Sequence, residues 1–324
     1  MKELLFLTAK DVETINLPMV EIIAILEDMF REKGTRRLEV APRSEIPLDE
    51  TSFSQAIPAS LPGMGVSGVK WVSVVPQNLE RALPRVTGLL ILNDSQTGLP
   101  ISVMDAAWIT AKRTGAATAV AAKYLARKDS KVFGVLGCGV QGRSNLEGVY
   151  TVLRSLEEVR AYDISQKNLD QFVAEMSAKF GLKIEPVNSP REMVRESDVF
   201  VTAGERLKSP NAIIERNWIA DGVFACALDL DTYWTREAMF SMDKFCTDDT
   251  RQVQHYMSIG YLHDIPNIHA DLGQIVIGER IGREDQEERI FSMHLGLALE
   301  DIAVAAKLYE RAKSLGVGEW VNLG

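Results

Sequence analysis

A glycine-rich turn between a short apolar strand and a helical segment constrains the fold of this chain more than any other feature. The predicted strand Lys131–Leu136 runs directly into Gly137-Cys-Gly-Val-Gln-Gly142, which has the spacing GxGxxG. In this spacing the first glycine permits a tight turn, the second lets a pyrophosphate approach the backbone, and the third lets the helix pack on the strand. The helix N-terminus attracts the phosphates. The turn is therefore expected to bind a dinucleotide, with Gly137 and Gly139 at the pyrophosphate.

A carboxylate at the end of the next predicted strand supports the same interpretation. Asp163 follows Gly142 by 21 residues, where it can accept hydrogen bonds from an adenosine ribose. Its charge opposes the 2′-phosphate of NADP, and the following Ile164-Ser-Gln166 offers no arginine to bind that group. The sequence therefore favours NAD as the cofactor, while the nearby Lys167 leaves NADP open.

The order of predicted strands and helices changes along the chain. The first third contains a helix that opens at Asn16-Leu-Pro18, followed by strand patterns and a hairpin, and it predicts a largely antiparallel sheet. An alanine-rich helix is expected over Ala106–Arg127. From Val132 to Thr247 short apolar runs alternate with amphipathic helices, which predicts a parallel sheet covered on both faces. A last helix is expected over Gly296–Leu315.

Composition excludes several classes of function. The chain has 36 Lys and Arg against 45 Asp and Glu, a formal net charge of −9, with no basic run to bind nucleic acid or an anionic membrane. Its 3 cysteines form no CxxC pair, and its 4 histidines form no HExxH pair, so we expect no metal site. No apolar run reaches the length of a membrane span. We expect a cytoplasmic protein.

Three cations outside the glycine turn are candidates for an anion site. These are Arg43, Lys70 and Arg113. Each cation alone is typical of a solvated surface charge. Lys70, however, lies inside the apolar stretch Val66–Val75, so it must either point to solvent by strand alternation or meet an anion. Arg113 is followed by small residues that leave room for a ligand, but spacing alone does not bring the three together.

Two carboxylates follow the fifth predicted parallel strand. Asp229 and Asp231 lie in Cys226-Ala-Leu-Asp-Leu-Asp-Thr-Tyr-Trp234. Open α/β sheets bind ligands outside the carboxyl ends of their strands, which makes these residues candidates for catalysis. The alternative is that an aspartate here only caps the next helix.

At this point the sequence resembles the ornithine cyclodeaminase and mu-crystallin family, and the resemblance covers almost the whole chain. The matching segments, in order, are Leu92–Pro100, Asp105–Ala116, Gly137–Gln141, Ala270–Val276 with Gly278 and Gly282-Arg283, and Gly296–Asp301. The resemblance implies a Rossmann doubly wound parallel sheet, residues 121–295. This domain is inserted in a mixed α+β dimerisation and substrate domain, residues 1–120 plus 296–324. It also implies a nicotinamide cofactor and a homodimer.

The resemblance assigns roles residue by residue. It implies that Asp231 is the catalytic acid. Lys70 is the remaining candidate for proton transfer if neither Asp231 nor Asp229 carries the proton. The implied substrate contacts are Arg43, Lys70 and Arg113, which bind a carboxylate. Asp229 and Leu295 are further candidates for contact with the substrate. The implied cofactor contacts are Thr87, Arg113, Gly137, Gly139, Val140, Gln141, Asp163, Thr202, Leu228 and His294.

Three positions depart from the family pattern and leave the substrate open. Asp229 stands where many relatives have glycine, Thr235 where lysine is usual, and His294 near a position that is commonly serine or asparagine. An extra carboxylate at Asp229 can recognise a distal amine, cap a helix or pair with Arg236.

Several activities follow from the resemblance. In the leading one, NAD⁺ takes the α-hydride of a small amino acid to give an imine, and Asp231 manages the protons. If the substrate is ornithine, its distal amine attacks the imine, ammonia leaves, and the returning hydride gives proline. If water attacks, the enzyme is an amino acid dehydrogenase or, in reverse, an imino acid reductase. A non-catalytic ligand-binding protein of the mu-crystallin type is the third candidate, and an acid at Asp231 argues against it.

Overall fold

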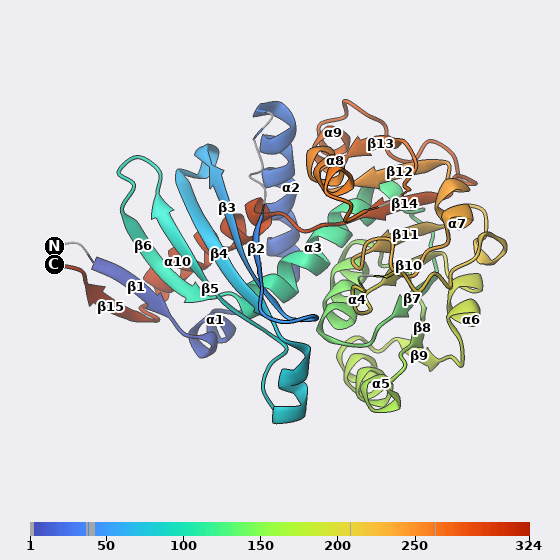
Figure 1. The fold of residues 1–324 in the computed structure, drawn as a ribbon, viewed down its shortest axis with the longest axis horizontal. Helices are drawn as coiled ribbons and strands as arrows, with labels where there is room; N and C mark the ends of the chain where they lie inside the picture. The colour runs from blue at the N-terminus through green and yellow to red at the C-terminus, as the bar shows by residue number, and fades with distance from the viewer. Residues whose placement is uncertain (1–2, 37, 39–42, 208, 263) are drawn as a thin grey trace. The chain divides into compact units, whose positions relative to one another are not determined.

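The computed structural model describes residues 3–36, 38, 43–207, 209–262 and 264–324, and the chain divides into two compact units (Figure 1). Unit 1 is Met1–Arg113 with Leu297–Gly324, and unit 2 is Thr114–Gly296. One unit is therefore built from both ends of the chain and the other from its middle.

Unit 1 is organised around a mixed sheet. Among its described residues seven strands pair in the order β15-β1-β6-β5-β4-β3-β2, with β1 and β6 parallel and the other neighbours antiparallel. The predicted hairpin is confirmed as β5 and β6. The strands are β1 (Glu3–Leu7), β2 (Ser44–Pro47), β3 (Phe53–Leu61), β4 (Val66–Val74), β5 (Val86–Asp94), β6 (Pro100–Asp105) and β15 (Glu319–Asn322).

Helix α10 (Ala298–Leu315) packs on β3, β4 and β5, and α2 (Met19–Arg36) packs beside it (Figure 1). Leu299 and Ile302 of α10 are fully buried, and the left-handed Gly316 ends the helix. A Cβ on Gly68 of β4 would come within 2.7 Å of the Ile302 side chain, so this glycine lets the helix approach the strand closely. The short helix α1 (Ala9–Ile15) and the 3₁₀ turns η1 (Pro62–Met64) and η2 (Pro76–Arg81) complete unit 1.

Unit 2 contains a parallel sheet of the doubly wound type. Its eight described strands pair in the order β13-β12-β14-β11-β10-β7-β8-β9, and all neighbours are parallel. The order reverses at β7, so β7 and β10 flank the point where such sheets bind ligands. The strands are β7 (Val132–Leu136), β8 (Glu158–Tyr162), β9 (Lys183–Pro186), β10 (Val199–Thr202), β11 (Phe224–Ala227), β12 (Lys244–Thr247), β13 (Ile268–Asp271) and β14 (Ile290–Met293).

Helices connect these strands. The central strands β10, β11, β12 and β14 are buried along their whole length, as expected for a parallel sheet covered on both faces. The predicted fold class, a Rossmann sheet together with a mixed α+β region, is confirmed. The helices are α3 (Ala107–Leu125), which spans the division between the units, α4 (Val140–Val152), α5 (Gln166–Phe180), α6 (Pro190–Arg195), η3 (Arg216–Trp218), α7 (Arg236–Phe240), α8 (Thr250–Ser258) and α9 (Leu272–Val276).

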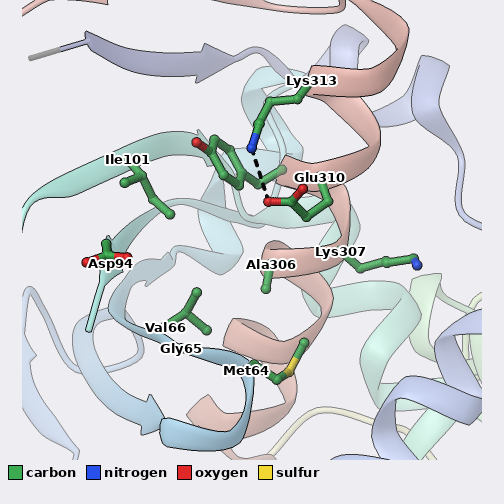
Figure 2. Close-up of a pocket in the computed structure, with 10 residues that line it drawn as sticks. Met64, Gly65, Val66, Asp94, Ile101, Ala306, Lys307, Glu310 and Lys313 are labelled. Atoms are coloured by element: carbon green, nitrogen blue, oxygen red, sulfur yellow. Dashed lines mark hydrogen bonds and ion pairs between the residues drawn. The ribbon is translucent and has the colours of Figure 1, made fainter. Parts of the chain in front are cut away.

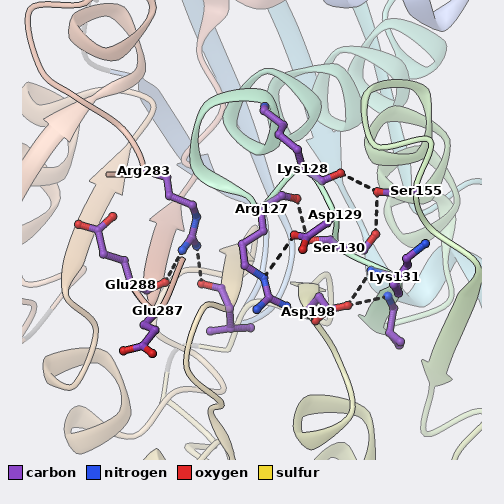
Figure 3. Close-up of polar contacts among 12 residues, drawn as sticks. Arg127, Lys128, Asp129, Ser130, Lys131, Ser155, Asp198, Arg283, Glu287 and Glu288 are labelled. Carbon is purple, nitrogen blue, oxygen red and sulfur yellow. Dashed lines mark hydrogen bonds and ion pairs between the residues drawn. The ribbon is translucent and has the colours of Figure 1, made fainter. Parts of the chain in front are cut away.

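Arg283 connects several segments of unit 2 by hydrogen bonds (Figure 3). Its guanidinium donates to the carbonyl oxygens of Leu125 at 2.8 Å, Glu288 at 2.7 Å, Asp285 at 3.0 Å and Val223 at 3.2 Å. The end of α3, the start of β11 and the loop before β14 therefore share one donor group.

A neighbouring ion pair holds two strand starts. Arg127 pairs with Asp198, whose other oxygen accepts hydrogen bonds from the backbone N–H groups of Lys131 at 2.7 Å and Val132 at 3.0 Å (Figure 3). This contact fixes the approach of the chain to β7, the strand that precedes the glycine turn.

No helix among the described residues is long and apolar enough to cross a membrane.

Candidate active site

Each of the three glycines in the turn after β7 is required for a different structural reason. Gly137 has a left-handed φ of +96°, and a Cβ there would lie 2.4 Å from the carbonyl oxygen of Ala203. A Cβ on Gly142 would lie 2.2 Å from the carbonyl oxygen of Gly137, so α4 could not pack as it does. A Cβ on Gly139 would meet nothing within 4 Å. The open space beside Gly139 is what a phosphate-binding turn requires.

The N-terminus of α4 faces this open space without a side-chain cap. Gly139 is its N-cap residue, and the next residue, Val140, is 65% exposed. The first N–H groups of the helix are thus available to an anion. Within the part of the chain that the structure describes, the buried Oε1 of Gln141 and Oδ1 of Asn145 have no hydrogen-bond partner. The residues of this turn fit a dinucleotide.

Asp163 follows β8 and is half-buried beside the turn. One of its carboxylate oxygens accepts a hydrogen bond from the N–H of Cys138 at 2.7 Å, and the other accepts one from the N–H of Ser165 at 2.8 Å. Arg143, which follows the turn, is bonded to Glu175 at 2.7 Å, whereas Lys167, four residues after Asp163, is exposed on α5. The predicted ribose-binding carboxylate therefore lies directly against the glycine turn.

The carboxyl ends of neighbouring strands bring further predicted residues to one edge of the sheet. Thr202 ends β10 and is paired with Leu136 of β7 on one side and with Ala227 of β11 on the other. Leu228 follows β11, and its N–H donates to the carbonyl oxygen of Thr202 at 3.0 Å. His294 follows β14, is buried, and lies 2.9 Å from the Ser292 hydroxyl through Nε2. The next residue, Leu295, belongs to the apolar core of unit 2.

Asp229 is buried, and both of its carboxylate oxygens accept hydrogen bonds from residues of unit 2. Its carboxylate accepts hydrogen bonds from the hydroxyl of Thr202 at 2.7 Å and from the N–H of Gly204 at 3.0 Å. Burial raises the pKa of Asp229 to about 7, although these two hydrogen bonds oppose the shift. Of the alternatives that the sequence left open, pairing with Arg236 is wrong, because Arg236 pairs with Asp264. Capping of the next helix is also wrong, because Thr235 caps α7.

Asp231 differs from Asp229 although only one residue separates them. Asp231 is half-buried, while the intervening Leu230 is buried with a left-handed φ of +62°. A leucine in this region is strained, and such strain clusters at functional sites. The left-handed residue breaks the strand alternation, so the two carboxylates lie in different environments.

The predicted cations lie in unit 1 together with two carboxylates of α10. The ammonium of Lys70 is 2.7 Å from Asp301 Oδ2, and both side chains are buried. The guanidinium of Arg113 contacts Asp301 Oδ1 at 3.1 Å and Glu300 Oε2 at 2.6 Å. Lys70 therefore meets an anion, which is one of the two outcomes that the sequence left open.

The charge of Arg43 also acts on Lys70. Burial lowers the pKa of Lys70 to about 8, the charge of Asp301 opposes this shift, and the charges of Arg113 and Arg43 add to it. Unit 1 thus gathers the three predicted carboxylate-binding cations. Thr87, which the resemblance assigned to the cofactor, is exposed on β5 of the same unit.

Sequence reasoning gave no role to Glu300 and Asp301. Both side chains are buried in the first turn of α10. The signal was present, because two adjacent acids interrupt a helical stretch whose other early residues, Ala298, Leu299 and Ile302, are apolar.

A cavity of about 400 Å³ in unit 1 lies apart from these residues (Figure 2). It contains no predicted site residue, and its Lys313 is already paired with Glu310 at 3.4 Å. The lining residues are Met64, Gly65, Val66, Asp94, Ile101, Ala306, Lys307, Tyr309, Glu310 and Lys313. Among the described residues no group of three or more His, Cys, Asp or Glu is arranged to hold a metal ion.

The sheet order, the glycine turn and the strand-end carboxylates define an α/β protein with a Rossmann-type unit. The model of the Ornithine cyclodeaminase/mu-crystallin family matches residues 2–316. The chain belongs to this family, and the identification made from its motifs is confirmed.

Known relatives match nearly the whole chain. The alanine dehydrogenase of Archaeoglobus fulgidus is 35% identical over 328 residues, which is 99% of this chain and 98% of that protein. The Delta(1)-pyrroline-2-carboxylate reductase of Thermococcus litoralis, solved with NADH and L-proline, is 35% identical with a TM-score of 0.88, covering 98% of this chain and 99% of that one. An archaeal alanine dehydrogenase dimer with bound NAD is 34% identical with a TM-score of 0.88, covering 99% and 100%.

Proposed function

We propose that this chain is an NAD(H)-dependent oxidoreductase that interconverts a small L-amino acid and its α-imine. The proposal draws on the family, on relatives that act on alanine or on pyrroline-2-carboxylate, and on the two functional clusters described above. The glycine turn of unit 2 suits a dinucleotide, and the buried cations of unit 1 suit a carboxylate. An amino acid dehydrogenase and an imino acid reductase are the two directions of this reaction.

The chemistry divides among the chain's own residues. The nicotinamide, when bound, supplies the hydride acceptor or donor for the α-carbon. The N-terminal turn of α4 with Gly139 receives the pyrophosphate, and Asp163 receives the ribose hydroxyls. Lys70 and Arg113 bind the substrate carboxylate through charge-assisted hydrogen bonds, which orient the α-carbon.

Proton transfer falls to Asp231. Oxidation of the amino acid removes an α-hydride and releases a proton from the nitrogen, and reduction of the imine requires a proton in return. Asp231 is half-buried at the carboxyl end of β11, where a side chain can exchange protons with a ligand and with water.

The hydrogen bonds of Asp229 are the observation that favours a net oxidoreductase over an ornithine cyclodeaminase. Cyclodeamination requires that the distal amine of the substrate be held, and Asp229 is the extra carboxylate that the sequence offered for this purpose. Its oxygens instead accept hydrogen bonds from Thr202 and Gly204. We assign Asp229 the role of holding the segment after β10 rather than of binding substrate.

The test is an activity panel that follows reduced nicotinamide and ammonia in parallel. With NADH present, we expect NADH to be oxidised when pyrroline-2-carboxylate, or pyruvate with ammonium, is added. With NAD⁺ and L-ornithine we expect no ammonia. Release of ammonia from ornithine without net NADH would identify a cyclodeaminase instead, and silence across the whole panel would support a ligand-binding protein.

NADH is expected to bind at least about tenfold more tightly than NADPH. The reason is the carboxylate of Asp163, since placing a like charge against a 2′-phosphate costs several kcal/mol. Calorimetric titration of both cofactors measures the ratio of their dissociation constants, and Asp163→Ser should bring the two constants closer together. Equal or tighter binding of NADPH would contradict the prediction and point to Lys167, which is exposed on α5.

We also propose that the protein is a homodimer that uses the face of the unit 1 sheet opposite α10. On this face Trp71 and Leu89 are cross-strand partners, 44% and 47% exposed, and Ile91 beside them is 39% exposed. A row of large apolar side chains on an open sheet face marks an interaction surface. The solved alanine dehydrogenase relative is a dimer.

Leu89→Asp is therefore expected to convert the dimer to a monomer. The aspartate would place a charge in an apolar interface, and light scattering coupled to size-exclusion chromatography measures the mass. Leu315→Asp, at an exposed residue on the last turn of α10, is the control and should leave the dimer intact. A wild-type monomer, or a dimer that survives Leu89→Asp, would contradict this surface.

A cytoplasmic location belongs to the same proposal. Cys138, Cys226 and Cys246 are all buried and free of disulfide bonds. Burial raises the pKa of each thiol, which keeps the thiols protonated and unreactive. Unpaired structural cysteines are typical of a reducing compartment.

A further inference from the structure

Two adjacent carboxylates in the first turn of α10 are buried. Glu300 and Asp301 lie in the first turn of this helix and are 0% and 1% exposed. Acidic residues are rarely buried to this degree unless they are paired. Their position in the first helical turn also places them near the positive end of the helix dipole, so a purely structural role has to be tested against a functional one.

Asp301 bridges the two cations. Its Oδ2 lies 2.7 Å from the ammonium of Lys70, and its Oδ1 lies 3.1 Å from Nε of Arg113. Glu300 contacts the same guanidinium through Nη1 at 2.6 Å. The two acids therefore contact Arg113 at two of its three guanidinium nitrogens, which fixes the orientation of the guanidinium, and Asp301 also contacts Lys70.

The surroundings of Lys70 make this bridge necessary. Its neighbours across β3 and β5 are the apolar Ile57 and Leu90. From α3 it meets the charge of Arg113 and, at 3.4 Å, the hydroxyl of Thr110, and the charge of Arg43 also acts on it. Burial and two like charges thus favour the neutral amine, and the negative charge that opposes them is that of Asp301.

We propose that Asp301 and Glu300 are positioning residues, which hold Lys70 charged and Arg113 oriented so that these two cations can receive the substrate carboxylate. This inference rests on the proposed function. Both acids act indirectly, since Asp301 maintains the charge of one cation and Glu300 sets the direction of the other.

The variants Asp301→Asn and Glu300→Gln test this assignment, with Glu310→Gln as the matched control. Glu310 lies on the same helix with an exposed side chain. We expect each buried variant to raise KM for the imino acid at least about tenfold with a smaller change in kcat, because the carboxylate is bound in both the ground state and the transition state. Glu310→Gln should leave both constants unchanged.

The pH profile separates the two acids from each other and from a structural role. In the wild type kcat/KM should fall above about pH 8, where Lys70 loses its proton. Asp301→Asn removes the charge that favours the ammonium, so the fall should begin at a lower pH. Glu300→Gln should keep the wild-type profile, since an arginine stays charged. Lower thermal stability with unchanged KM and unchanged profile would overturn the proposal.

A second readout does not depend on turnover. Lys70 binds a proton less readily in the folded than in the unfolded protein, so it makes stability rise with pH between about 8 and the unfolded pKa near 10.5. The difference in melting temperature between wild type and Lys70→Met should show this rise. In the Asp301→Asn background the rise should start at lower pH, and an unmoved onset would refute the role of Asp301. Should the activity panel fail, this readout still decides whether Asp301 maintains the charge of Lys70, while the proposed function falls separately.

Discussion

Asp231→Asn is expected to lower turnover by about 10²–10⁴-fold while NADH binding is retained, because a positioned general acid or base contributes a factor of this size. The substitution keeps the size of the side chain and removes its titrating proton. Steady-state kinetics in both directions measure the loss, and calorimetry measures cofactor binding. The half-buried position after the left-handed Leu230 is what distinguishes Asp231 from its neighbour.

Two further aspartates serve as comparisons. Asp264→Asn removes an exposed carboxylate of the same unit that pairs with Arg236, and it should leave turnover unchanged. Asp229→Asn places an amide where Thr202 and Gly204 both donate, so it should weaken cofactor binding and lower thermal stability. Loss of turnover in Asp229→Asn alone, with Asp231→Asn near wild type, would exchange the roles of the two residues.

Arg283→Met should lower the free energy of unfolding by about 4 kcal/mol. The substitution leaves four carbonyl oxygens, those of Leu125, Val223, Asp285 and Glu288, without their charged donor. Each such bond is worth roughly 1.5–3 kcal/mol when lost alone, and the losses within one network of bonds add up to less than their sum. We expect the apparent Tm to fall by roughly 10 °C, measured by circular dichroism.

The geometry of the guanidinium matters as much as its charge. Arg283→Lys keeps the charge but offers one compact ammonium, which cannot reach oxygens on three separate segments, so it should recover little of the loss. Arg280→Met, at a nearby exposed arginine, is the control and should melt as the wild type does. A wild-type Tm in Arg283→Met would show that this arginine does not hold the segments together.

Local patterns explain what the sequence predicted well. The glycine turn, the strand before it and the helix after it depend on residues that are adjacent in the chain, and Gly137, Gly139 and Gly142 each meet the requirement that the spacing implies. The hairpin of β5 and β6 depends on a short polar turn in the same way. Such features need no knowledge of distant contacts.

Distant contacts explain what the sequence did not predict. The edge strand β15 pairs with β1 at the opposite end of the chain, and no local pattern announces that pairing. The strands β13 and β14, which follow the predicted strands in the chain, were not predicted. Asp301 is separated from Lys70 by most of the chain, so their contact could not be derived.

The two strand-end aspartates show a third limit. Residues two apart in a strand share a face, so the spacing alone gave Asp229 and Asp231 equivalent surroundings. The left-handed backbone of Leu230 removes that equivalence. A conformation that leucine adopts only under constraint from its surroundings leaves no trace in the pattern of residue types.

The order of synthesis has a consequence for a unit built from both ends of the chain. A ribosome finishes all of Thr114–Gly296 before α10 and β15 emerge, so the nascent Rossmann unit can complete its core while the first sheet waits. During that interval the sheet lacks the helix that packs on β3, β4 and β5, and Lys70 and Arg113 lack their acids. The residues of α10 and β15, which are translated after unit 2, therefore govern when unit 1 becomes native.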